Sequence, residues 1–305
     1  MVSASQGNYV HTSPSFLSQE PLDISLLKGK QDRLARQLRD LGSLLVAFSG
    51  GVDSAFLLAV AHETLGKGAV AATAVSEIYP RREEEQARFF ALERDIEHII
   101  FQSNEMDLPA FVRNGPDRCY HCRKSFYEKL LEIAGERSIE GIAHGANADD
   151  LQDYRPGLEA ANEMGIMAPL VDAGLTKEEI RFLSKKMGLS QWDKPAMACL
   201  ATRIPYGSPV TDQKLKMIED AEQFLVDRGF RQCRVRHHGS VARIELDDSG
   251  LASIMEADLK KEVVQRLRQI GFLHVVLDLE GYESGRMNRV LGMPNPKESR
   301  GPADE

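Results

Sequence analysis

The sequence is poor in the features that mark several special classes of protein. Its 305 residues include four cysteines and one tryptophan, too few cysteines for a disulfide-stapled scaffold. No apolar run approaches the ~20 residues that a membrane-spanning helix needs, so we expect no membrane partner. The first lysine or arginine is Lys28, which argues against a secretory signal or a transit peptide. We therefore predict a cytoplasmic protein.

The sequence also has fewer basic than acidic residues. The chain carries 38 lysines and arginines against 46 aspartates and glutamates, a net charge of -8. A protein that grips polyanions is normally basic, so we predict no nucleic-acid partner. The length suffices for one large α/β domain or two smaller ones, and the composition is that of an ordinary globular protein.

What the sequence does contain is an alternation of short apolar runs with amphipathic stretches. The apolar runs, which predict strands, cover 43–48, 69–75, 98–101 and 139–145. The amphipathic stretches, which predict helices, cover 25–41, 54–65, 81–94 and 123–135. A capping box of Thr176 and Glu179 predicts one more helix, which Gly188 ends. This alternation predicts an α/β fold with a parallel sheet sandwiched by helices.

The pattern changes after Ile204–Pro209, where two prolines and a glycine interrupt the chain. A helix (212–228), paired strands (231–246), a second helix (256–270) and a strand (273–279) then predict a smaller α+β unit. We therefore expect a nucleotide-binding domain over 21–204 and a C-terminal α+β domain over 205–293. The Ser-, Thr- and Pro-containing residues 1–20 are expected to be disordered, and 294–305 to form a frayed tail.

The hexapeptide "SGGVDS", residues 49–54, follows a predicted buried strand and precedes a helix. Its two glycines, Gly50 and Gly51, let backbone N–H groups face an anion, and the helix directs the positive end of its dipole to the same place. Ser49 and Ser54 add hydroxyl donors. The loop lacks the lysine of the Walker A motif, so transfer of a γ-phosphoryl group does not fit it.

A second polar segment, "HGANADDLQDYRPG", follows the last strand of the predicted sheet. It gathers Asp149, Asp150 and Asp153 with Arg155, a set that suits Mg²⁺ and phosphate. A solvated acidic loop is the alternative interpretation.

Three cysteines stand in two motifs. Cys119 and Cys122 form a C-x-x-C pair, and Cys199 follows in "AMACLATRIPYG". A redox pair, half a zinc site, buried small side chains and cluster ligands are all compatible with this pattern. Three thiolates would hold an iron–sulfur cluster with one iron left open. Cys233 lies in a strand context that predicts packing.

The blocks "AFSGGVDS", "RCYHCRKSFY", "HGANADDLQDYRPG" and "ACLATRIPYG" together resemble the LarE-type, ATP-dependent sulfur transferases of nickel-pincer nucleotide biosynthesis. The resemblance runs from about Asp32 to Met293 and implies the PP-loop fold of the ATP-pyrophosphatases, which is like that of the adenine nucleotide alpha hydrolases. Such enzymes adenylate the carboxylates of pyridinium-3,5-biscarboxylic acid mononucleotide, release pyrophosphate and form thiocarboxylates. Family members tend to be homo-oligomers, and transient contacts with other proteins of the same biosynthesis are expected.

The resemblance also implies roles for individual residues. It places ATP and Mg²⁺ at Ser49, Gly50, Gly51, Asp53, Ser54, Asp149 and Arg155. One branch of the family sacrifices the cysteine that matches Cys199, and another has all three cysteines and suits a [4Fe-4S] cluster that donates a bound sulfide. This chain keeps all three, so the cluster held by Cys119, Cys122 and Cys199 is favoured. Arg203, Arg234 and Arg236 are candidates for binding the phosphate of the substrate, the last two on one strand face.

Three other functions remain as alternatives. A PP-loop tRNA thiolase shares the loop and often a C-x-x-C, but the acidic balance argues against it. An ammonia-dependent synthetase of the NAD or GMP type would not need three cysteines. A non-catalytic nucleotide or metal sensor would bind ATP without releasing pyrophosphate.

Overall fold

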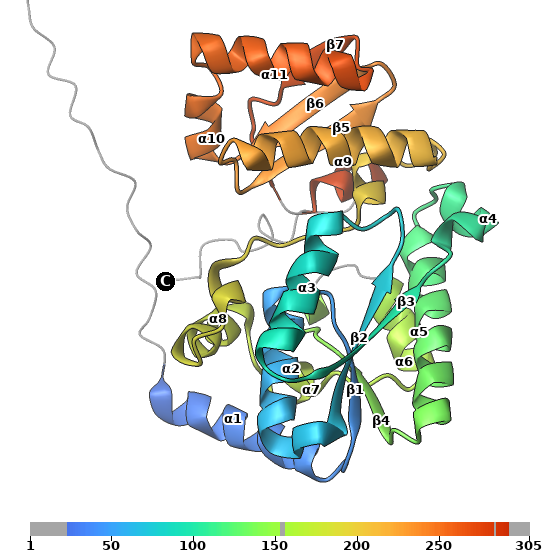
Figure 1. Ribbon diagram of the computed structural model, residues 1–305, viewed down its shortest axis with the longest axis vertical. Coiled ribbons are helices and arrows are strands. Elements are labelled where there is room, and N and C mark those ends of the chain that lie inside the picture. Colours follow the sequence, from blue (N-terminus) through green and yellow to red (C-terminus); the bar gives the residue numbers. More distant parts are fainter. Residues whose placement is uncertain (1–22, 153–155, 284, 293–305) are drawn as a thin grey trace, which may run out of the picture.

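The computed structural model describes residues 23–152, 156–283 and 285–292. The predictions of disorder for 1–20 and of a frayed tail for 294–305 lie outside these residues. The described chain forms two sheets, a four-stranded one in the N-terminal part and a three-stranded one in the C-terminal part (Figure 1). None of its helices is both long and apolar enough to cross a membrane.

The large sheet has the strand order β3-β2-β1-β4, and every pairing in it is parallel. Its strands are β1 (Leu44–Ala47), β2 (Ala69–Val75), β3 (Glu97–Gln102) and β4 (Gly141–His144). All four predicted strands are therefore confirmed. Parallel pairing puts the carboxyl ends of all four strands at one edge, where β1 continues into the loop 49–54.

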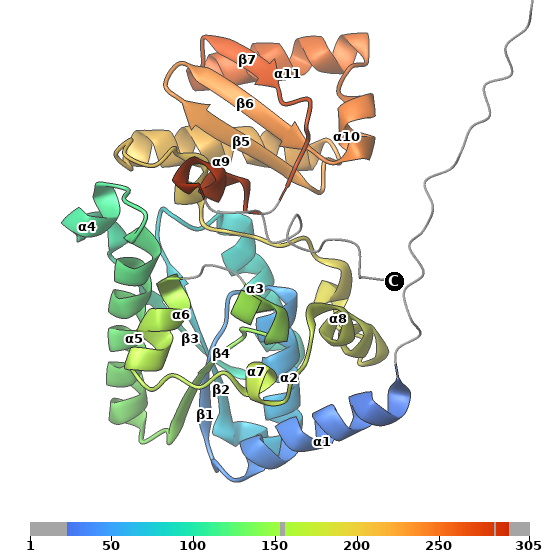
Figure 2. The same cartoon turned by 180° about the vertical axis from the view of Figure 1, so that it is seen from behind.

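Helices cover both faces of this sheet. Consecutive residues of β1 point to opposite sides and are all buried apolar residues, so each face needs a covering layer. Leu44 and Val46 pack in one core and Leu45 and Ala47 in the other. The first core is closed by α1 (Ile24–Arg39), α2 (Val52–Leu65), α3 (Arg81–Glu93), α7 (Pro169–Asp172) and α8 (Lys177–Lys186). The second is closed by α5 (Arg118–Arg137) and α6 (Pro156–Glu163), which lie side by side (Figure 2).

Two helix starts differ from the predictions. Helix α5 begins at Arg118 and not at residue 123, so the C-x-x-C pair lies inside the first turns of the helix. Residues 118–122 contain neither glycine nor proline, so nothing in them stops the helix from extending back to Asp117. Helix α2 begins at Val52, two residues before the predicted start at residue 54. The predicted capping box of Thr176 and Glu179 is confirmed at the start of α8.

The C-terminal part packs helices against a mixed sheet with the order β5-β6-β7. Its elements are α9 (Asp212–Asp227), β5 (Cys233–His238), β6 (Val241–Leu246), α10 (Asp248–Ser253), α11 (Ala257–Ile270) and β7 (His274–Leu277). Strands β5 and β6 are antiparallel, and β6 and β7 are parallel. Cys233 is buried in the core of this unit, as its strand context predicts.

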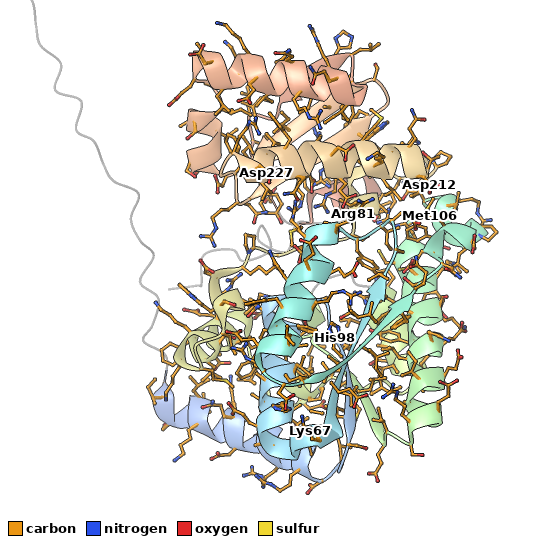
Figure 3. The ribbon with its side chains drawn as sticks, viewed as in Figure 1. Lys67, Arg81, His98, Met106, Asp212 and Asp227 are labelled. Atoms are coloured by element: carbon orange, nitrogen blue, oxygen red, sulfur yellow. The ribbon has the colours of Figure 1, made fainter. Side chains whose placement is uncertain are left out.

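The two parts meet over the carboxyl edge of the large sheet. The backbone N–H of Arg81, at the start of α3, donates to the Glu219 carboxylate on α9 at 2.9 Å, and Figure 3 shows Arg81 beneath that helix. A further apolar cluster joins both parts, with Ile78 and Leu200 from one side and Leu215 from the other. The segment that carries Cys199 runs through this junction. Between α3 and α5 the chain also forms the short helix α4 (Pro109–Val112).

Candidate functional site

The loop 49–54 has the conformation that an anion site requires. Gly50 has φ +70°, a left-handed conformation that a side chain would strain, and Gly51 is the N-cap of α2. No side chain of the described residues caps this helix, so its first N–H groups are available to a ligand. The Ser49 and Ser54 hydroxyls lie 3.2 Å apart, and Ser54 Oγ donates back to the Gly51 carbonyl.

The end of β4 closes the loop from the side. A Cβ atom on Gly145 would lie only 2.8 Å from the backbone nitrogen of Ser54, so the close approach of the two segments requires glycine. Two residues later, Asn147 Nδ2 donates to Asp53 Oδ1 at 3.3 Å. The segment after β4 therefore adjoins the loop, as the sequence predicts for residues that follow neighbouring parallel strands.

Asp53 and Asp149 are joined through one residue of α8. The carboxylate of Asp53 forms an ion pair with Nζ of Lys177, and Asp149 Oδ2 accepts from the backbone N–H of that same lysine at 2.9 Å. Asp149, a predicted ligand of the cofactor, thus holds the start of α8 in this structure. The predicted Arg155 and Asp153 lie outside the described residues.

A second lysine contacts the loop from its other side. Nζ of Lys194 donates to the Gly50 carbonyl at 2.9 Å and lies 2.7 Å from Glu83 Oε2. Sequence reasoning identified neither Lys177 nor Lys194, because both are far from the loop along the chain. One signal was present for Lys177, since a lysine in the first turn of a helix opposes the helix dipole.

The sulfur atoms gather near the same junction. Cys119 and Cys122 lie in the first turns of α5, and Cys199 precedes a short 3-10 helix over Leu200–Arg203. Cys122 and Cys199 pack in the same apolar cluster, and Nη2 of Arg118 lies 3.9 Å from Cys119 Sγ. All four cysteines are unpaired thiols.

Burial keeps the thiols of Cys122 and Cys199 protonated at neutral pH. It raises the pKa of Cys122 to about 12, an effect that Arg123 opposes and the sulfurs of Cys199 and Cys119 reinforce. Burial likewise raises the pKa of Cys199, against the guanidinium of Arg118. The three cysteines influence one another electrostatically, and Arg123 and Arg118 oppose the rise in the pKa of Cys122 and of Cys199, respectively.

A cluster held by thiolates is the group that the resemblance implies here. The donor chemistry fits such a group. The three thiols interact electrostatically with the guanidinium groups of Arg118 and Arg123, and the buried Nε of Arg118 has no hydrogen-bond acceptor within the described chain. In the conformation described, however, no three His, Cys, Asp or Glu side chains among the described residues are placed to hold a metal ion. The cluster therefore stays a prediction.

The three predicted substrate arginines lie close to the Cys199 segment. Arg203 is buried and pairs with both oxygens of Glu222, at 2.8 and 2.9 Å. Its Nη1 also donates to the carbonyl of Cys199 at 3.1 Å. Arg234 donates to the carbonyls of Cys233 and Ala196.

Arg236 completes this set. It donates to the Thr202 carbonyl at 2.8 Å and pairs with the buried Glu245 at 2.8 Å. All three guanidinium groups thus anchor backbone carbonyls of residues 196–202, and their substrate contacts stay predictions. Burial and the nearby Arg203 lower the pKa of Arg234. The negative charge around this guanidinium group therefore does not fully compensate for its burial.

Comparison with known proteins gives relatives over nearly the whole chain. An uncharacterized protein of Synechocystis is 41% identical over 266 residues, which cover 87% of this chain and 99% of that protein. The pyridinium-3,5-bisthiocarboxylic acid mononucleotide synthase of Lactiplantibacillus plantarum is 35% identical over 269 residues, 88% of this chain and 97% of that protein. The argininosuccinate synthase of Natronomonas pharaonis, a PP-loop protein, is 26% identical over 164 residues, 50% of this chain and 40% of its own length. No family model matches the chain.

Proposed function

We propose that this chain uses ATP to convert the carboxylates of pyridinium-3,5-biscarboxylic acid mononucleotide to thiocarboxylates. The chain belongs to the LarE-type family, which includes the pyridinium-3,5-bisthiocarboxylic acid mononucleotide synthase of Lactiplantibacillus plantarum. A carboxylate is a poor electrophile because substitution would have to expel oxide. Joining it to AMP supplies a good leaving group, which sulfur can then displace.

The single observation that supports this function most is the proximity of the anion loop to the sulfur atoms. Lys194 reaches the loop at Gly50, and Cys199 follows it by five residues. Five residues span at most ~17 Å of extended chain, so the sulfur of Cys199 belongs to the same end of the sheet as the loop. Nucleotide and sulfur chemistry can therefore act on one bound substrate.

The parts of the site take the following roles in this proposal. The loop 49–54 holds the outer phosphates of ATP, with Asp53 beside Mg²⁺, and leaves the α-phosphorus open to the attacking carboxylate. Arg234, with Arg203 and Arg236 next to it, offers positive charge to the phosphate of the substrate. Burial between the two parts of the chain keeps water from the acyl adenylate before sulfur arrives.

The sulfur has two candidate sources. A [4Fe-4S] cluster ligated by Cys119, Cys122 and Cys199 would supply a bound sulfide when present, and the guanidinium groups of Arg118 and Arg123 would balance its negative charge. Alternatively, Cys199 gives up its own sulfur and becomes dehydroalanine. We propose the first because the chain keeps all three cysteines and because Cys122 and Cys199 pack in the same apolar cluster.

An anaerobic purification tests the proposal. We expect a brown protein with about four irons per chain, ATP- and substrate-dependent release of pyrophosphate, and loss of iron on replacing Cys119, Cys122 or Cys199 by alanine. Cys233→Ala, in the core of the C-terminal part, is the matched control and should keep its iron. A colourless protein that acquires dehydroalanine at Cys199 would contradict the cluster and support sacrifice.

The same assay separates the other functions. Pyrophosphate release that requires tRNA would indicate a thiolase, and full activity without the three cysteines would indicate an ammonia-using synthetase. Binding of ATP with no pyrophosphate release from any acid would indicate a sensor. We further propose that the protein works in the cytoplasm as a homo-oligomer, without nucleic acid or membrane partners.

A further inference from the structure

The loop 49–54 contains no cation, although the ligand proposed for it is a polyanion. Its only titratable residue is Asp53, whose carboxylate adds negative charge beside the proposed phosphate site. A phosphate-binding loop without a lysine of its own needs positive charge from elsewhere in the fold. Within the described residues, Lys177 and Lys194 place ammonium groups against it.

These two lysines have different surroundings. The ammonium of Lys194 is bound by the Gly50 carbonyl and by Glu83, and its side chain is only 13% exposed. A backbone carbonyl and a carboxylate whose side chain is 12% exposed fix it as a support for the shape of the loop. The side chain of Lys177 is 31% exposed and that of its partner Asp53 is 20% exposed, so this ion pair is open to an entering ligand.

The position of Lys177 in its helix argues against a purely structural role. It is the first residue of α8, where the helix dipole disfavours a positive charge. Asp149 nevertheless binds its backbone N–H, which fixes the direction in which the side chain leaves the helix. A partly exposed ion pair also contributes little to stability.

We infer that Lys177 binds the pyrophosphate part of ATP and stabilises it as the leaving group. The inference rests on the proposed use of ATP by the loop. Without nucleotide, the ammonium neutralises Asp53 and prevents a net negative charge at the loop. The entering phosphates carry more negative charge than one carboxylate. The Lys177 ammonium therefore leaves the Asp53 carboxylate and binds the phosphates. No bond forms or breaks at the lysine.

Titration calorimetry of the full chain with inorganic pyrophosphate and, separately, with AMP tests this role. Lys177→Ala should weaken pyrophosphate binding about 10- to 100-fold, the loss expected for one charged hydrogen bond, and change AMP binding less than about twofold. Lys177→Arg should restore part of the affinity, because it keeps the charge. A structural role alone would not separate the two ligands.

Lys67→Ala is the matched control. Lys67 forms an exposed ion pair with Asp95, at the end of the sheet away from the C-terminal part (Figure 3). Its loss should leave the affinity for both ligands unchanged. Equal affinities of wild type and Lys177→Ala for pyrophosphate would overturn the inference alone, as would an equal loss for both ligands.

The outcomes for the proposed function are distinct. A wild-type protein that binds neither pyrophosphate nor ATP would overturn both the loop assignment and the role of Lys177. A protein that binds pyrophosphate through Lys177 but forms no thiocarboxylate would contradict the sulfur transfer and support the inference.

Discussion

Gly145→Ala should damage the anion loop without touching any of its residues. An alanine Cβ at this position would lie 2.8 Å from the Ser54 nitrogen, 2.9 Å from Ser54 Cα and 3.1 Å from the Asp53 carbonyl carbon. All three atoms belong to the backbone at the start of α2, so no flexible side chain can move aside. The end of β4 and the first turn of α2 must separate by about half an ångström to restore ordinary contacts.

The magnitude follows from this geometry. Overpacking of a well-packed region typically costs about 1–3 kcal/mol, and we expect the free energy of unfolding to fall by that amount. The Ser54 amide is one of the N–H groups offered to the anion, so its displacement should also weaken pyrophosphate binding, by about tenfold. The two effects should appear together, because one backbone shift produces both.

Urea unfolding and calorimetry with pyrophosphate measure these effects. Gly135→Ala is the control, since Gly135 lies within α5 and an added Cβ meets no atom within 4 Å. That variant should gain up to about 1 kcal/mol and bind pyrophosphate like the wild type. A Gly145→Ala protein with wild-type stability and wild-type affinity would refute the packing argument, and a loss of stability alone would refute the link to the anion site.

Three more predictions concern buried charge, pH and capping. Glu222→Gln should lower the free energy of unfolding by about 3–5 kcal/mol in urea titrations, because it leaves Arg203 buried without its anion; a loss below about 1 kcal/mol would contradict this. Burial, with Arg123, lowers the pKa of His144 to about 4. The unfolded chain then binds more protons, so stability should fall as the pH drops below about 6.5, and the wild type should lose about 2 kcal/mol more than His144→Asn between neutral pH and about pH 5. Equal losses in the two proteins would count against the assignment. Thr176→Ala should cost about 1 kcal/mol by removing the side-chain acceptor of the Glu179 N–H, with Thr176→Ser, which keeps that acceptor, close to the wild type in the same titration.

The strands and most helices followed from the sequence because their causes are local. Buried runs such as 69–75 read as strands from composition alone, and β2 has those bounds. The capping box at Thr176 depends on residues three positions apart, so it too is visible in the sequence. The predicted start of α5 is five residues too late, although Asp117, a residue type that favours the N-cap position, directly precedes the observed start.

The loop 49–54 is also recognisable in the sequence, because two glycines between a strand and a helix indicate a tight turn that only residues without a side chain adopt easily. The partners of its charged group cannot be recognised in the sequence. The partner of Asp53 is Lys177, 124 positions later, and no local pattern links residues at that separation. Gly145 could be read as part of a loop, but only the packed structure shows that its missing side chain makes room for the start of α2.

Local sequence signals are enough to predict the sheet, the anion loop and three cysteines near nucleotide-binding motifs, because each depends on neighbouring residues or on one short motif. The charges around these features depend on the folded packing. It placed Arg118 beside Cys119, and it directed Arg203 and Arg236 to the carbonyls of the Cys199 segment. A side chain's partner depends on which surfaces the packed helices and strands bring together, and long-range packing is not encoded in any single stretch of sequence.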